Sequence, residues 1–184
     1  YESRCVNLDN RFGAALATNH LIQQGHRSIA YIGSMQQIAD AIERQQGYTD
    51  ALIQNGIPVD ERLIIQSSPD ELGGERAVIE LLNQGRKMTG IVCYNDPIAV
   101  GALSTLIDND IKVPNQISVI GFDDVLINYL QPRLTTIRYP VVEMARQAAR
   151  LAIALAHGEP APDVTNLFTP TLVRRYSVAP AVSS

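Results

Sequence analysis

The alternation of short apolar runs with longer segments of helical period constrains this chain most. Runs of strand length occur at 28–32, 63–65, 89–94 and 117–122, and segments of helical period lie between them. Neighbouring parallel strands need crossover connections of this length, which are usually helices. The pattern therefore predicts an α/β fold, a three-layer doubly wound parallel sheet with helices at 12–24, 39–55, 74–83 and 96–107.

The two ends of the chain depart from this alternation. Residues 133–139 are extended, 141–157 form an alanine-rich helix, 160–163 are a linker, and two short strands follow at 167–168 and 171–175. At the amino end, residues 4–8 are typical of a strand, although only three residues precede it. A strand that begins in this way favours a fragment of a longer protein.

Charge and cysteine content exclude several classes of function. The 15 Lys and Arg residues stand against 19 Asp and Glu, a formal net charge of −4, so the counterion release that drives DNA binding is missing. No apolar run approaches the about 20 residues of a membrane helix, and the first ten residues lack a secretion signal. Cys5 and Cys93 have no CxxC spacing, so both are expected in the core of a cytoplasmic protein.

Polar residues follow the apolar runs at the points where the strands should end. In an open parallel sheet, ligands bind outside the carboxyl ends of the strands. Amide and carboxylate groups beside an arginine match the hydroxyl groups of a sugar or the edge of a purine. The sequence therefore predicts a pocket for a neutral polar ligand among the residues Gly33, Ser34, Ser67, Ser68, Pro69, Asn95, Asp96, Asp123 and Asp124.

Several candidate residues, and the arginine at position 44, also have a simpler structural interpretation. Helical position alone favours Arg44 as a surface residue paired with Glu43 or Asp40. Asn95 and Asp96 precede Pro97 in the arrangement of a helix cap.

Acidic and aromatic residues at the boundaries of strands and helices can likewise serve either ligand binding or the structure. Asp123 and Asp124 are equally suited to a turn, and no third ligand is spaced for a metal. Phe12 and Tyr139 can stack on a ligand or fill the core.

Motifs of enzymes are missing from the sequence. There is no GxSxG, GxGxxG or GxxxxGK[ST] string, and the three histidines are scattered near helix ends. We therefore expect no catalysis, no metal and no cofactor.

Six strings, in order along the chain, resemble the regulatory core of LacI/GalR-family transcriptional repressors. They are Leu8-Asp9-Asn10 with Gly13, the segment 20–30, Arg44-Gln45-Gln46-Gly47-Tyr48, Tyr94-Asn95-Asp96 with Ala99 and Gly101-Ala102, Ile120-Gly121-Phe122-Asp123-Asp124, and Leu134-Thr135-Thr136-Ile137. Segments 69–75 and 170–175 look most like repressors of galactose operons.

The resemblance implies a periplasmic-binding-protein-like (type I) clamshell of two subdomains with an effector in the cleft. It assigns 1–136, closed by a strand at 169–176, to the C-terminal subdomain, and 137–168 to an N-terminal subdomain that is mostly missing. Helix 141–157 should then lack its usual sheet and pack atypically, borrow a partner chain or be poorly ordered. The DNA-binding domain is absent from this chain, so operator DNA is bound only through another region.

The resemblance also implies roles for individual residues. Arg44, Asn95 and Asp123 match effector-binding positions, and Asp40 lies one helical turn before Arg44. Further residues that line up with cleft or hinge positions are Phe12, Ser68, Pro69 and Tyr139. A homodimer is expected, with Tyr129 and Leu130 in its interface.

These observations favour one function over two rivals. The favoured function is a sensor of a galactose-like monosaccharide in a cytoplasmic repressor, with no membrane partner. The alternatives are a periplasmic sugar-binding protein of a transporter and an α/β enzyme acting on a sugar or nucleotide.

Overall fold

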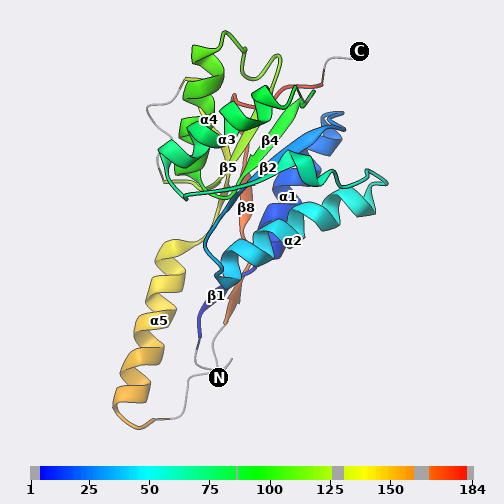
Figure 1. Cartoon of the computed structure of the whole chain (residues 1–184). Coiled ribbons are helices and arrows are strands. Elements are labelled where there is room, and N and C mark those ends of the chain that lie inside the picture. Colours follow the sequence, from blue (N-terminus) through cyan, green and yellow to red (C-terminus); the bar gives the residue numbers. More distant parts are fainter. Residues whose placement is uncertain (1–4, 86, 126–130, 160–165, 182–184) are drawn as a thin grey trace.

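A six-stranded sheet organises the computed structural model, which describes residues 5–85, 87–125, 131–159 and 166–181 (Figure 1). The strand order is β3-β2-β4-β5-β6-β8, in which only the β6–β8 pairing is antiparallel. A separate parallel pair joins β1 to β7. The strands are β1 (Asn7–Leu8), β2 (Ile29–Ser34), β3 (Ile64–Ser67), β4 (Gly90–Cys93), β5 (Ser118–Asp123), β6 (Thr135–Arg138), β7 (Leu167–Phe168) and β8 (Thr171–Val173).

Four helices cover the two faces of the sheet. One face carries α1 (Asn10–Gln23) and α2 (Ala39–Gln54), and the other carries α3 (Glu71–Asn83) and α4 (Asp96–Asp108) (Figure 1). A short 3₁₀ helix lies at Glu61–Leu63. The predicted three-layer α/β fold is confirmed.

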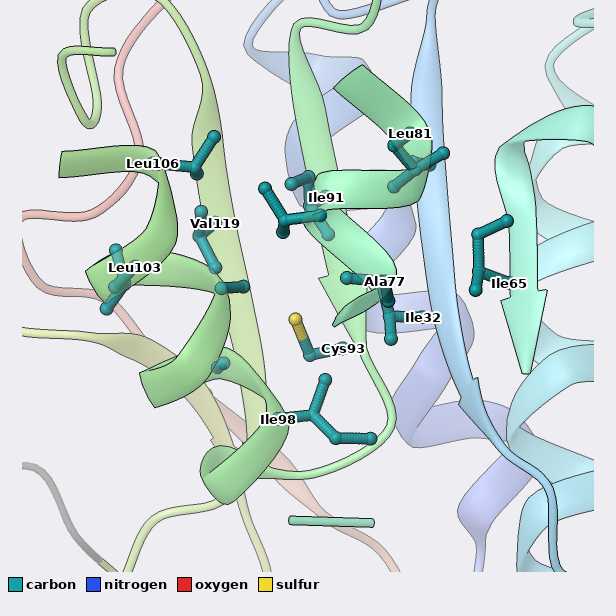
Figure 2. Packing of buried hydrophobic residues seen from close by; sticks show 14 of the residues in the cluster. Ile32, Ile65, Ala77, Leu81, Ile91, Cys93, Ile98, Leu103, Leu106 and Val119 are labelled. Atoms are coloured by element: carbon teal, nitrogen blue, oxygen red, sulfur yellow. The ribbon is translucent and has the colours of Figure 1, made fainter. Parts of the chain in front are cut away.

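Successive side chains of the buried strands point alternately into two separate hydrophobic cores, one on each face of the sheet. In β2, Ile29 and Tyr31 pack under α1 and α2, whereas Ala30 and Ile32 pack under α3 and α4. This period of two places apolar residues on both faces, as expected for a sheet covered by helices on each side. Figure 2 shows the second core, in which Ile32 and Ile91 of the sheet lie near Leu81, Ile98 and Leu106 of the helices.

Helix α3 begins three residues earlier than the sequence predicts. Gly73 and Gly74 both belong to the helix, which Asp70 caps by accepting from the backbone N–H of Gly73. A Cβ on Gly74 would lie 2.1 Å from the carbonyl oxygen of Ile98. These glycines therefore allow α3 and α4 to approach closely.

The amino-terminal strand is shorter than expected. Only Asn7 and Leu8 form β1, because its partner β7 offers two residues for pairing. Cys93 is buried as predicted, but Cys5 lies outside the strand and is exposed, so the prediction that it belongs to the core is wrong.

Helix α5 (Val141–Ala156) extends away from the sheet (Figure 1). Only Leu151 and Ala154 are buried, whereas Val142 is 69% and Ile153 59% exposed. The helix therefore packs little against its own chain, in line with the expectation that it lacks its usual sheet. Assignment of 137–168 to another subdomain stays a prediction.

Residues 177–181, near the carboxyl end of the chain, form hydrogen bonds with the amino-terminal ends of β5 and β6. The Ser177 hydroxyl donates to the carbonyl of Val119 in β5 and accepts from the N–H of Thr135 in β6, at 2.6 and 2.8 Å. The carbonyl of Ala179 accepts from His26 at 3.0 Å. Three elements that are distant in sequence meet at this segment.

The predicted dimer interface, a membrane helix and a metal site can be examined only among the described residues. Tyr129 and Leu130 lie outside the described residues. Within the described ranges, no helix is long and apolar enough to cross a membrane. The same residues hold no group of three or more His, Cys, Asp or Glu side chains placed for a metal ion.

Candidate functional site

Arg44 of α2 is the central charged residue at the carboxyl edge of the sheet. It is only 6% exposed. Its Nε donates to Oδ1 of Asn10 at 2.9 Å, and Nη1 donates to the carbonyl of Tyr94 at 2.6 Å. The interpretation of Arg44 as a surface residue paired with Glu43 or Asp40 is therefore wrong.

Aromatic rings hold the same guanidinium from its faces. Cζ of Arg44 lies 3.7 Å from the ring centroid of Phe122 and 4.6 Å from that of Tyr94. A guanidinium that stacks on aromatic rings keeps its N–H groups available for hydrogen bonding in its own plane. The described residues provide no hydrogen-bond partner for Nη2 of Arg44.

A cavity of about 630 Å³ lies directly against Arg44. Of the residues predicted from the sequence, Arg44, Asp40 and Tyr139 line it. The cavity lies where β1, α2 and the start of α5 meet, and its remaining lining residues are Val6, Asn7, Leu8, Asp9, Asn10, Arg11, Ala39, Glu43, Gln46, Met144 and Leu167. Its size falls within the range of small-molecule sites.

Asp123 ends β5 beside Arg44. Its Oδ1 lies 3.5 Å from Nη1 of Arg44, and its backbone is left-handed with φ of 115°. Burial raises the pKa of the Asp123 carboxyl to about 7, an effect that Arg44 opposes and Asp96 reinforces. The guanidinium at 44 and the carboxylate at 123 therefore share one edge of the sheet.

Asn95 performs the capping role that the sequence allowed. Its Oδ1 accepts from the backbone N–H of Ile98, and its Nδ2 donates to the carbonyl of Pro69, at 2.9 and 3.0 Å. It follows Tyr94, whose carbonyl accepts from Arg44, so it lies at the same edge although it does not line the cavity.

The remaining predicted residues are more scattered. The Ser68 hydroxyl donates to Asp70 and helps to start α3, whereas Pro69 is half-buried. Phe12 is 45% exposed on α1 and does not line the cavity. The structure thus places Arg44, Asp40 and Tyr139 on the cavity wall, whereas Asp123 does not line the cavity and lies behind them against Arg44.

Sequence reasoning missed Asn10. It is 4% exposed, accepts from Arg44 and lines the cavity. Its place in the Leu8-Asp9-Asn10 string was the available signal, but the motif does not reveal a contact across 34 residues.

The arrangement is suited to binding through hydrogen bonds. Three carboxylates, Asp9, Asp40 and Glu43, line the cavity with a guanidinium that Asp123 partly neutralises. Acceptors of this kind match hydroxyl donors, and Nη2 of Arg44 can donate to a hydroxyl or ring oxygen.

Comparison with known proteins agrees with this arrangement of sheet and site. Residues 18–178 match the family of periplasmic binding protein-like domains. The chain belongs to this family. The relatives and the solved structure that it resembles are transcriptional regulators, among them a member of the LacI family.

The individual relatives narrow the class. The chain is 57% identical to the HTH-type transcriptional regulator GalR of Escherichia coli (strain K12) over 180 residues, which are 97% of this chain and 52% of the relative. It is 46% identical to GalS of Salmonella typhimurium (strain LT2) over 97% of this chain and 53% of the relative. The chain spans about half the length of these curated relatives.

A solved structure shows the same fold. A sugar-binding transcriptional regulator of the LacI family from Escherichia coli, complexed with phosphate, superposes with a TM-score of 0.89 at 34% identity. The match covers 95% of this chain and 63% of that one.

Proposed function

We propose that this chain is the ligand-sensing part of a sugar-responsive transcriptional repressor. It binds a galactose-like monosaccharide without performing chemistry on it, and binding changes the affinity of the whole protein for operator DNA. The observation that carries this proposal is the buried Arg44, which faces a cavity of about 630 Å³ with Nη2 unpaired among the described residues.

Arg44 and Asp123 form the centre of the proposed site. Arg44 donates from Nη2 to a sugar oxygen, and the Asp123 carboxylate accepts from a sugar hydroxyl. Charge-assisted bonds of this kind are about twice as strong as neutral ones. The contacts of Arg44 to Asn10 and Tyr94 fix its orientation before the sugar arrives, which lowers the entropic cost of binding.

Two of the other predicted residues complete the site around this pair. Asp40 and Tyr139 line the cavity and contact the sugar from its open side. Asn95, Phe12, Ser68 and Pro69 do not line the cavity, and only the family resemblance supports a part for them in binding.

Coupling to DNA operates through a region outside this chain. The net charge of −4 means that the chain itself lacks the excess of basic residues that drives binding to DNA. GalR and GalS are HTH-type regulators, and the chain spans about half of their length. This supports a DNA-binding part elsewhere in the protein. Residues 1–136 with 169–176 act as one subdomain in this scheme, and 137–168 belongs to the other.

The curated relatives favour a regulator over the transporter alternative. GalR and GalS are both described as transcriptional regulators, and neither is described as an enzyme. A cytoplasmic location follows from this function.

We also infer that the protein acts as a homodimer. Exposed apolar side chains on the outer faces of α3 and α4 support it, namely Leu72, Ile79 and Ile107. Tyr129 and Leu130, which lie outside the described residues, remain proposed interface residues. Sedimentation of the full-length protein at the mass of one chain would contradict the dimer.

Calorimetry on the full-length protein with D-galactose, D-glucose and D-ribose tests the function. Arg44→Ala should weaken the binding of the preferred sugar by about 2–5 kcal/mol, since it removes a buried charge-assisted contact. Arg44→Lys keeps the charge and loses the planar fork, so it should also bind weakly.

The matched control is Arg62→Ala, which removes an exposed arginine that pairs with Asp60. It should leave affinity unchanged. A loss below about 0.5 kcal/mol for Arg44→Ala, or no binding of any of the three sugars, would overturn the proposed function.

A further inference from the structure

The turn that follows β5 has an unusual backbone. Asp123 and Asp124 are consecutive non-glycine residues with φ of 115° and 65°. Such conformations are disfavoured for L-residues and persist only where surrounding contacts impose them. Asp123 contributes the carboxylate that faces Arg44, so the contacts that impose this backbone also decide where that carboxylate lies.

Asp96 supplies contacts to this turn from the start of α4. It is 0% exposed. Its Oδ2 accepts from the backbone N–H of Val125 at 3.0 Å, and the backbone N–H of Asp124 faces the same carboxylate. Its Oδ1 accepts from the hydroxyl of Thr136 in β6 at 2.6 Å. One buried side chain thus binds the turn and the neighbouring strand together.

Gly121 makes room for this carboxylate. A Cβ at position 121 would lie 2.3 Å from Oδ1 of Asp96. The strand therefore allows Asp96 to approach the sheet closely enough to reach residues beyond its end.

Asp124 holds the same turn from the other side. Its carboxylate, 4% exposed, pairs with Arg138 of β6 and with Nη2 of Arg175, the latter at 2.8 Å. With Asp124 pointing to the arginines and the backbone held by Asp96, only the Asp123 side chain of this acidic pair faces Arg44.

We propose that Asp96 is a positioning residue for the effector site, which acts through the turn after β5 and sets the Asp123 carboxylate against Arg44. Asp96 does not line the cavity and has no hydrogen bond to Arg44 among the described residues. The inference rests on the proposed function for its effect on sugar binding, whereas the contacts to the turn stand independently of it.

The experiment is a mutant cycle on the full-length protein with D-galactose as the probe. Asp96→Ala should weaken binding at least tenfold. Asp123→Gly removes the carboxylate and leaves the left-handed backbone unstrained. If Asp96 acts through Asp123, adding Asp96→Ala to Asp123→Gly should weaken binding less than twofold further.

A conservative variant separates positioning from bulk stability. In Asp96→Asn the amide oxygen can still accept from Val125 while the amide nitrogen donates to Thr136, so binding should fall less than threefold. The matched control is Ser177→Ala, which removes fully buried hydrogen bonds at the opposite ends of β5 and β6. It should change affinity less than twofold.

Amide hydrogen exchange gives a readout that needs no sugar. The N–H groups of Asp124 and Val125 should exchange at least tenfold faster in Asp96→Ala than in Ser177→Ala. Equal exchange in the two variants, or full losses of affinity that multiply in the double variant, would overturn the proposal. If the unaltered protein binds none of the sugars, the proposed function fails, and the exchange rates alone decide whether Asp96 holds the turn.

Discussion

Helices α4 and α5 are both recognisable as helices in the sequence, but they differ in how much of each is covered by the rest of the chain. The 13 residues of α4 bury eight side chains or backbone positions against the sheet and α3, whereas the 16 residues of α5 bury only Leu151 and Ala154. Both segments have helical period, and both form helices. The difference shows that periodicity predicts the helix itself, whereas a partner surface elsewhere in the chain decides how much of it is buried.

The largest test of this contrast is a pair of identical substitutions. Leu106→Ala in α4 removes a side chain that is 0% exposed, so the free energy of unfolding should fall by about 2–5 kcal/mol. Leu155→Ala in α5 removes one that is 38% exposed, and the loss should stay below about 1 kcal/mol. Urea unfolding of the 184-residue chain measures both, and equal losses would abolish the contrast.

A smaller effect on stability should come from the buried carboxyl of Asp123, which ends β5. The pKa of Asp123 is raised to about 7 in the folded protein, mainly by burial, so the folded state holds a proton that the unfolded state has already lost above about pH 4. Stability from this group is therefore complete below about pH 4 and is lost as the pH rises through about 7.

Comparison with Asp123→Asn isolates this effect. Between pH 5 and 7 the unaltered chain should lose stability relative to the variant, on the order of 1 kcal/mol per pH unit. Glu143→Gln, which removes an exposed carboxylate from α5, serves as the control. Parallel stability profiles for the unaltered chain and Asp123→Asn would contradict the effect of burial.

The smallest effect should come from the apolar side of α5. Val142 is 69% exposed, so Val142→Lys should change the free energy of unfolding of this chain by less than about 0.5 kcal/mol. A loss of 2 kcal/mol in urea unfolding would mean that the side chain is buried in solution, and α5 would then resemble α4.

Local signals in the sequence predicted most of the sheet and its helices. Apolar runs located the strands, and the Asn95-Asp96-Pro97 string correctly placed the start of α4. The first three residues of α3 were missed because the glycines at 73 and 74 are more typical of the end of a loop than of the interior of a helix. Glycine is needed at position 74 because α4 approaches the helix closely there. That approach depends on residues far along the chain.

The site was harder to predict for the same reason. Helical position made Arg44 a surface residue, and only the family resemblance indicated a binding role. Its burial depends on Asn10, Tyr94 and Asp123, which lie on three other segments. No local pattern around position 44 encodes those contacts, and the same holds for the contacts of Asp96 to residues 125 and 136.

The segment around Ser177 has a consequence for synthesis on the ribosome. Strands β5 and β6 are complete by residue 138, yet the Ser177 hydroxyl that bridges Val119 and Thr135 is made about 40 residues later. An emerging chain can assemble the layers around β2 and β4 early, but the last parallel pair lacks this bridge until translation has passed position 177. Nascent chains that stall before this point should be cut by proteases preferentially at β6.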